Sequence, residues 1–247
     1  LSSAASDVYK RQNRNSLQLF DMLHSMRQFD DLTYVHSVNV ALIASILGQW
    51  LKFSEKDIRI LTISGLLHDI GKIMIPNEIL TKPGKLTVAE YNIMKQHVNF
   101  GYEKVKNQNI DIRMKEACLL HHEKCDGTGY PFGLKSDHIP AVAKIIAIAD
   151  VYDAMTSARV YRGALCPFEV IDTMYKDAFT KFEPEYILPF LKNVASSYIN
   201  NDVRLSDGRI GKVVLINENA LSLPIVQCED EFIDLSKTRG LTVSAIL

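Results

Sequence analysis

Histidine and aspartate residues in this chain recur in a pattern that is typical of metal binding. Five of the seven histidines belong to it, within the runs HDIGK at 68–72 and HHEKCDGTGYP at 121–131 or as single residues. Imidazole and carboxylate groups in this density indicate a two-metal hydrolytic centre rather than a packed core. In chain order the pattern comprises His36, His68, Asp69, His97, His121, His122 and Asp150.

Two of the motifs place ligand-type side chains next to each other in the sequence. Adjacent residues on an α-helix point about 100° apart, so His68 and Asp69 cannot share one ideal helical face. At a helix end the backbone turns and both can reach one metal pair, and Gly71 supplies such an end. The two oxygens of an aspartate can bridge two metals, which one imidazole cannot do. For His121 and His122, the glycine-rich run DGTGYP supplies the same break.

Several of these residues also have a structural interpretation. His36 and His97 are single histidines on amphipathic segments, where a core or surface histidine is more common than a ligand. Asp150 lies in the apolar run KIIAIADVYDAM, where burying a carboxylate is costly unless a cation compensates it. Glu123 fits either the orientation of a ligand imidazole or a surface charge, and Asp153 fits either a supporting or a structural role.

Taken together, HDIGK, HHEKCDGTGYP and ADVYDAMTSARVYR, with His36 and His97, resemble the motifs of the HD-GYP phosphodiesterases. This branch of the HD superfamily cleaves cyclic dinucleotides. The resemblance covers roughly residues 30 to 200, and its motifs are specific. It implies a mainly α-helical bundle and a metal set in which Asp69 bridges two ions. The implied ligands are His36, His68, Asp69, His97, His121, His122 and Asp150.

The resemblance also implies the cofactor, two divalent metal ions. Mixed imidazole and carboxylate ligands suit Fe or Mn, and Zn or Ni could compete. Some HD-GYP members hold a third ion with a glutamate one helical turn before the first histidine. This chain has Leu32 at that position, so we expect a two-metal centre.

Catalytic and substrate-binding roles follow from the same resemblance. Asp69 and Lys72 are the expected catalytic residues, and Lys72 would neutralise a non-bridging phosphate oxygen. Arg159 and Arg162 match positions at which relatives hold substrate phosphates, for which the guanidinium fork is suited. The relatives' Asp-Arg-Pro run is Ala158-Arg159-Val160 here, so the loop geometry differs from the family pattern.

The GYP loop itself consists of Gly129, Tyr130 and Pro131. The resemblance makes this loop a substrate-binding element or a docking site for diguanylate cyclase (GGDEF) domains. A rigid turn with a packed tyrosine is the structural alternative.

The expected function is that of a bacterial phosphodiesterase in second-messenger signalling, which hydrolyses cyclic di-GMP to pGpG and/or GMP. One alternative is hydrolysis of another cyclic dinucleotide such as cyclic GMP-AMP, and another is a general HD nucleotide phosphohydrolase. An alternative of a different class is a catalytically silent cyclic-dinucleotide receptor or docking module. Relatives also suggest a homodimer formed through helical faces.

The composition bounds the remaining possibilities. The 247 residues, 47% of them hydrophobic, suffice for one large domain or one domain with a small appendage. A net charge of −1 argues against polymeric nucleic acid as a partner. The longest nearly apolar stretch, residues 141–149, is too short to span a bilayer, so no membrane segment is expected here. Four cysteines without a C-x-x-C pair indicate free thiols in a reducing compartment, and we expect a cytoplasmic location.

The N-terminal segment is treated separately. Residues 6–12, SDVYKRQ, resemble the in-frame translation of a transposon-end sequencing adapter, and the chain begins without Met. We therefore expect residues 1–12 to be non-native, with a polar tail as the alternative. On the first interpretation an upstream sensory domain is missing, and the full-length protein could be anchored in a membrane through it.

Helical periodicity runs through residues 13–202, which we expect to form the HD-GYP catalytic domain. The pairs Ser54/Asp57 and Thr87/Glu90 are expected capping boxes at helix starts. The expected helices cover residues 17–27, 33–51, 54–68, 87–106, 114–122 and 141–157, and two more begin near Pro167 and Pro184.

The pattern changes after about residue 202 to that of a small β module at 203–247. VRLSDGRIGKVVLIN places β-branched residues on both sides of Asp207-Gly208, which is a hairpin signal. SLPIVQCEDEFIDL predicts two more strands around an acidic turn. The expected fold class is therefore mainly α with a small C-terminal β-rich extension.

Overall fold

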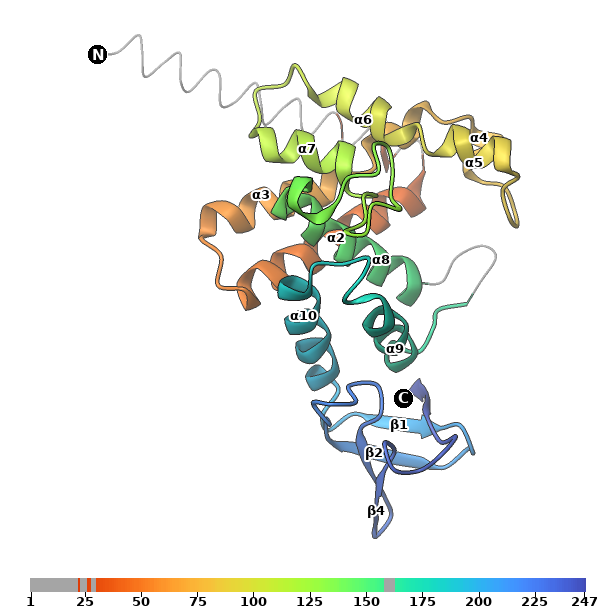
Figure 1. Ribbon diagram of the computed structural model, residues 1–247. Helices are drawn as coiled ribbons and strands as arrows, with labels where there is room; N and C mark the ends of the chain where they lie inside the picture. The colour runs from red at the N-terminus through yellow and green to blue at the C-terminus, as the bar shows by residue number, and fades with distance from the viewer. Residues whose placement is uncertain (1–21, 23–25, 28–29, 158–162) are drawn as a thin grey trace. The chain divides into compact units, whose positions relative to one another are not determined.

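The computed structural model describes Met22, Met26, Arg27, residues 30–157 and residues 163–247. It divides into two compact units, Leu1–Asp150 and Val151–Leu247, and the boundary falls inside one long helix. The first unit is helical, and the second combines helices with an antiparallel sheet (Figure 1). The predicted fold class, mainly α with a C-terminal β-rich extension, is confirmed. The predicted helix at residues 17–27 lies largely outside the described residues.

Two long helices open the first unit, and both begin at side-chain caps. Helix α2 spans Asp31–Trp50, and the carboxylate of Asp30 accepts from the backbone N–H groups of Leu32 and Thr33. Helix α3 spans Glu55–Leu67, and the Ser54 hydroxyl accepts from the backbone N–H of Asp57. Such caps satisfy N–H groups that have no partner inside the helix. The helices pack against each other, which places the start of α2 and the end of α3 in one region.

Helix α2 is more apolar than the sequence interpretation recognised. By length and composition it could cross a membrane, unlike the shorter stretch considered above. However, α2 packs on α3, and it carries the buried polar side chains of His36 and Ser37. A core helix has the same composition, and these buried contacts favour that interpretation.

The predicted single helix at 87–106 is in fact two helices. Helix α5 spans Val88–Met94, and α6 spans His97–Val105. The Thr87/Glu90 capping box is present at the start of α5. The chain turns at residues 95–96, so His97 begins a new helix rather than lying in the middle of a long one.

Short elements join these helices. The 3₁₀ helix η1 spans Ile70–Met74, and α4 spans Asn77–Leu80. Helix α7 spans Ile112–Leu120 and lies beside α6 (Figure 1). After it come the 3₁₀ helix η2, Ser136–His138, and α8, Ala141–Thr156, whose Ile145, Ile146 and Ile148 are buried.

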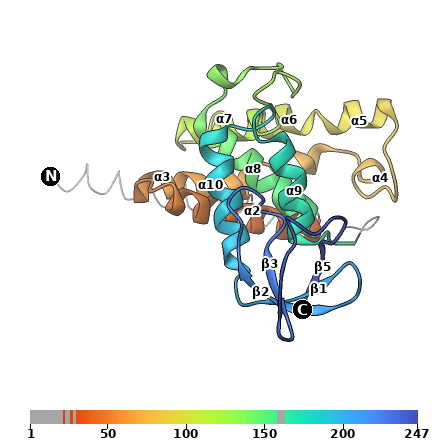
Figure 2. The ribbon, with the colours of Figure 1, turned by 60° about the horizontal axis from the view of Figure 1, so that its bottom comes forward.

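The second unit contains α9, Pro167–Asp177, and α10, Pro184–Ser197. Each begins with proline in its first turn, as predicted. Proline lacks a backbone N–H, and the first N–H groups of a helix have no partner inside it, so proline is tolerated there. The sheet has the strand order β4-β3-β2-β1-β5 and is antiparallel throughout (Figure 2). Its strands are β1 Asp202–Leu205, β2 Ile210–Leu215, β3 Ile225–Cys228, β4 Glu231–Asp234 and β5 Val243–Ile246.

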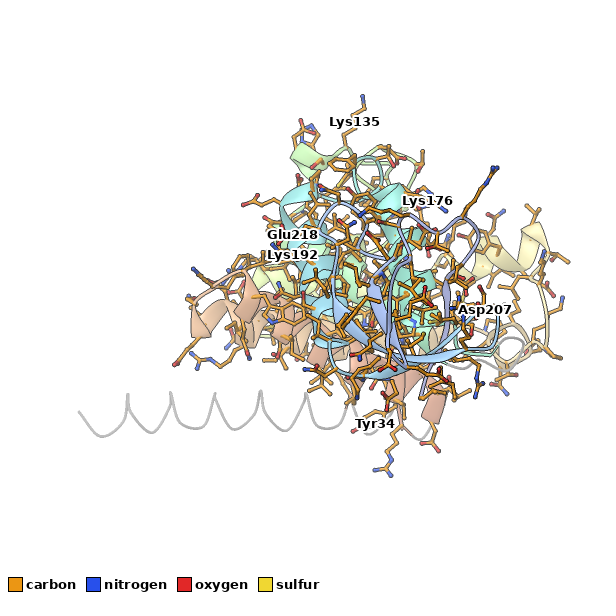
Figure 3. All side chains as sticks on the ribbon, turned by 90° about the horizontal axis from the view of Figure 1, so that it is seen from below. Tyr34, Lys135, Lys176, Lys192, Asp207 and Glu218 are labelled. Carbon is orange, nitrogen blue, oxygen red and sulfur yellow. The ribbon has the colours of Figure 1, made fainter. Side chains whose placement is uncertain are left out.

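Both predicted hairpins, β1–β2 and β3–β4, are confirmed, whereas β5 was not predicted. Alternate residues of β1 and β2 are buried, which gives the sheet one covered face. Lys192 of α10 forms an ion pair with Glu218 at 2.6 Å, and the two lie next to each other in Figure 3. The sheet thus groups with α9 and α10 into one unit, and the first strand begins at Asp202. A separate β module at 203–247 stays a prediction.

Candidate metal centre

The structure brings all seven predicted ligand residues together in the first unit. They fall into three overlapping groups, and within each group one potential ligand atom per residue lies within 4.8 Å of the others. Six of the residues are buried and His122 is partly buried. The groups are Asp69 with His97, His121 and His122; His36 with His68 and Asp69; and His68 with His121 and Asp150.

Asp69 is the centre of the cluster, and its two carboxylate oxygens face different histidines. It lies between the end of α3 and the start of η1, where the helical path changes. Oδ2 lies 3.2 Å from Nε2 of His68 and 3.7 Å from Nε2 of His36. Oδ1 lies 3.3 Å from Nε2 of His97 and 3.9 Å from Nε2 of His121. This is the arrangement expected of a carboxylate that joins two ligand groups.

Asp150 of α8 supplies the second carboxylate. Its Oδ1 lies 3.0 Å from Nε2 of His36, and its Oδ2 lies 3.9 Å from Nδ1 of His122. Burial alone would raise the pKa of Asp150, but the hydrogen bond with His36 and the neighbouring histidines lower it overall. Asp150 is therefore a carboxylate at neutral pH.

Hydrogen bonds to the backbone fix the tautomers of three imidazoles. A carbonyl oxygen can only accept, so each bonded Nδ1 carries the proton, and in the neutral ring Nε2 presents a lone pair. These Nε2 atoms are the ones that face Asp69. The bonds run from His68 to Gly65 at 2.7 Å, from His97 to Met94 at 2.7 Å and from His121 to Ala117 at 3.0 Å.

The cluster leaves acceptors facing one another. Nε2 of His97 and Nε2 of His121 are 3.4 Å apart, and each presents a lone pair in the tautomer just described. Within the part of the chain that the structure describes, Nε2 of His68 and Oδ1 of Asp69 are buried without a hydrogen-bond partner. Buried polar atoms in this state are costly unless something binds them. A cation satisfies lone pairs that converge in this way, so the residues fit a divalent metal.

Burial also sets the charge state of the histidines. It lowers the pKa of His97 and lowers that of His121 further, and it lowers the pKa of His122 to about 3 despite the opposing effect of Asp150. All three rings are therefore neutral at pH 7, which is the form that binds metal.

Lys72 of η1 contributes a positive charge at the edge of the cluster. Its Nζ lies 2.5 Å from Oδ2 of Asp69. Burial would raise the pKa of Asp69, but Lys72 and His68 outweigh it and hold the pKa well below its usual range. The cluster thus holds two carboxylates, Asp69 and Asp150, and places them beside the three neutral rings of His97, His121 and His122, which is a set of donors that suits a cation.

The GYP loop lies against this cluster. The Tyr130 ring stacks on the ring of His122, with centroids 4.7 Å apart. Gly129 passes so close to the preceding turn that an added Cβ would lie 2.5 Å from backbone atoms of Glu123 and His122. The carboxylate of Glu123 accepts from the backbone N–H groups of the residues that follow the loop, Phe132 at 2.7 Å, Gly133 at 3.1 Å and Leu134 at 2.9 Å.

Glu123 therefore differs from both sequence interpretations. It is buried, so it is no surface charge, and its described hydrogen bonds hold the loop rather than a ligand imidazole. The Asp153 carboxylate accepts from the Ser157 hydroxyl at 3.0 Å, in the second unit. Arg159 and Arg162 lie outside the described residues, so their roles stay predictions.

A family model described as HD domain matches residues 4–186. The chain therefore belongs to the HD-domain family, and its HD pair and GYP loop make it an HD-GYP form of that domain. The match begins inside the segment expected to be non-native, whose structure is not described.

Two similar proteins are cyclic-dinucleotide phosphodiesterases by name. A cyclic di-GMP phosphodiesterase of Pseudomonas aeruginosa is 36% identical over 203 residues, which cover 82% of this chain and 49% of that protein. The 3'3'-cGAMP-specific phosphodiesterase 2 of Vibrio cholerae is 36% identical over 157 residues, which cover 63% of this chain and 30% of that protein. The chain thus spans half or less of the length of these relatives.

Among solved structures, the HD domain of the L. monocytogenes phosphodiesterase PgpH, in complex with cyclic-di-AMP, has a similar fold. The TM-score is 0.54 at 18% sequence identity, and the match covers 72% of this chain and 95% of that chain. At this identity the likeness shows the fold alone.

Proposed function

We propose that this protein is a metal-dependent phosphodiesterase that hydrolyses cyclic di-GMP to pGpG and/or GMP. The observation that carries the proposal is the pair of histidine groups around Asp69, one at each carboxylate oxygen. A cyclic di-GMP phosphodiesterase that is 36% identical over most of this chain supports the choice of substrate.

The proposed cofactor is a pair of divalent ions, Fe or Mn, bridged by Asp69. The proposed ligands are His36, His68, Asp69 and Asp150 for one ion, and Asp69, His97, His121 and His122 for the other. Their mixed nitrogen and oxygen donors suit Fe or Mn, and Zn or Ni could compete for the same donors. The chemistry that such ions supply is activation of a water molecule and polarisation of the phosphodiester.

The protein side chains would contribute orientation and charge. The Nδ1–H bonds to Gly65, Met94 and Ala117 hold three imidazoles with Nε2 toward Asp69, so the donors are preorganised. Lys72 would stabilise negative charge on a non-bridging phosphate oxygen, and Arg159 and Arg162 would bind substrate phosphates. Tyr130, stacked on His122, would exclude water from that side of the substrate.

A second candidate substrate is 3′,3′-cyclic GMP-AMP. A Vibrio cholerae phosphodiesterase specific for that compound is 36% identical over 63% of this chain. The two substrates share the ring of two phosphodiesters and differ in one base, so the metal centre alone does not separate them. We propose cyclic di-GMP as the preferred substrate and a cytoplasmic site of action. A GGDEF domain and a second copy of the chain remain proposed partners.

A substrate panel tests the proposal. The protein is loaded anaerobically with Mn²⁺ or Fe²⁺ and given cyclic di-GMP, 3′,3′-cyclic GMP-AMP, cyclic di-AMP or a nucleoside triphosphate, and products are resolved by chromatography. We expect pGpG and/or GMP from cyclic di-GMP at the highest kcat/KM. Preferential hydrolysis of the triphosphate would favour a general HD phosphohydrolase, and binding of cyclic di-GMP without turnover would favour a receptor.

A further inference from the structure

We propose that Tyr91 and Lys95 form a guanine-binding site beside the metal centre. The inference rests on the proposed function and names the part of the substrate that α5 recognises. Tyr91 lies on α5, and Lys95 directly follows the helix with backbone angles that are still helical. Four positions apart, the two residues lie on one face. Lys95 Nζ lies 5.3 Å from the centroid of the Tyr91 ring and 6.0 Å from that of Tyr130.

The position of these residues is tied to the metal centre by short links. Met94 lies between them, and its carbonyl accepts the Nδ1–H bond of His97. The Tyr91 ring meets the Tyr130 ring edge-on, with centroids 6.5 Å apart. Tyr130 in turn stacks on His122. Only the ring of Tyr130 thus lies between Tyr91 and the proposed metal ligand His122.

Burial in a core does not explain the aromatic ring at position 91. Helix α5 buries none of its residues, and Tyr91 itself is 47% exposed. The capping box at Thr87 and the ion pair between Glu90 and Lys82 at 2.7 Å already hold the helix start. An exposed ring beside a reaction centre provides a flat surface on which a nucleobase stacks.

Lys95 is suited to recognising guanine by hydrogen bonding. Glu90, the one acidic residue of α5, is engaged by Lys82 and by the Thr87 cap. Across the described ranges, Lys95 forms no ion pair with a carboxylate. Guanine presents two acceptors, O6 and N7, to a cationic donor, whereas adenine places an amino group where O6 would be. An ammonium group at this position therefore favours guanine over adenine.

The two residues make different contributions, so two substitutions separate them. Lys95→Met removes the charge and keeps the aliphatic stem. It should raise the KM for cyclic di-GMP about tenfold with little change in kcat, and leave the inhibition constant of cyclic di-AMP unchanged. Tyr91→Leu removes the ring on which any base can stack. The KM for cyclic di-GMP and the inhibition constant of cyclic di-AMP should therefore both rise about tenfold. Tyr91→Phe should retain wild-type values.

Matched controls are Lys104→Met, an exposed lysine on α6, and Tyr175→Leu, a tyrosine of α9 with 40% exposure. Both should leave the two constants unchanged. An equal rise in both constants for Lys95→Met would mean that Lys95 binds phosphate, and it would overturn the guanine assignment. Unchanged constants in Lys95→Met and Tyr91→Leu would overturn the site altogether.

The outcome for this site is distinguishable from that for the proposed function. If the wild-type protein turns over cyclic di-GMP and the variants match it, only the guanine site is wrong. If the wild type has no turnover, the dissociation constants of cyclic di-GMP and cyclic di-AMP are measured by calorimetric titration. The variants are then compared with the wild type through these dissociation constants in place of KM and the inhibition constant. Failure of the wild-type protein to bind either compound would overturn both proposals.

Discussion

Replacing Asp69 by Asn is expected to abolish turnover and release the metal. The substitution keeps the shape of the side chain, but it replaces one oxygen that faces a histidine pair with an NH₂ group and removes the negative charge. Only one of the two histidine groups would then face an oxygen of this side chain. We expect kcat/KM for cyclic di-GMP to fall at least about a thousandfold, which is roughly 4 kcal/mol of barrier. Bound metal, measured by mass spectrometry, should fall in parallel.

The control for this variant is Asp137→Asn. Asp137 is exposed and its described ion pair is with His138, away from the cluster. It should retain wild-type metal content and rate. Circular dichroism of Asp69→Asn checks that the helices are intact, because Lys72 loses its partner in this variant. Full activity in a folded Asp69→Asn protein would contradict the bridging role.

Replacing Gly71 by Ala is expected to have the largest effect on folding. An added Cβ would lie 1.9 Å from the carbonyl oxygen of His97 and 2.4 Å from the backbone nitrogen of Gly101. Because backbone occupies this space, η1 and α6 must move apart, and His97 begins α6. We expect a loss of about 1–3 kcal/mol or more in the free energy of unfolding, measured by urea denaturation, together with weaker metal binding.

Gly101 provides the matched control, because it lies on the other side of the same contact. A Cβ there would have its nearest neighbour, the Gly71 nitrogen, at 3.4 Å, and Ile70 and Cys118 follow at 3.6 and 3.8 Å. These are ordinary contacts, and Ala is favoured over Gly within a helix by about 1 kcal/mol. Gly101→Ala should therefore be neutral or stabilising. Equal stability of the Gly71→Ala and wild-type proteins would show that the two elements are not held in close contact.

The sequence was sufficient to predict which side chains gather, because its motifs resemble those of a known family. Residue type and spacing alone left His36 and His97 open, and the resemblance placed them in the set. It was also sufficient for the capping box at Thr87 and for the hairpin around Asp207-Gly208, since these depend on local chemistry. At Ser54 the structure shows an N-cap, in which the hydroxyl accepts from the backbone N–H of Asp57, rather than the predicted capping box. That the gathered residues bind metal remains a prediction.

Features that depend on tertiary contact could not be read from the sequence. Gly71 was expected to end a helix, whereas the structure shows that its missing Cβ makes room for His97. The turn before His97 has no glycine or proline to mark it, so one helix was predicted instead of two. Glu123 bonds to backbone groups nine to eleven residues away, and β5 pairs with a strand that lies far from it in the sequence.

The central claim is that two metal ions share Asp69. Anomalous scattering from crystals of the Mn²⁺-loaded protein, recorded near the manganese edge, tests it directly. We predict two peaks, each about 2.0–2.2 Å from one oxygen of Asp69, one near His36, His68 and Asp150 and the other near His97, His121 and His122. A single peak, or peaks that lie away from Asp69, would contradict the account.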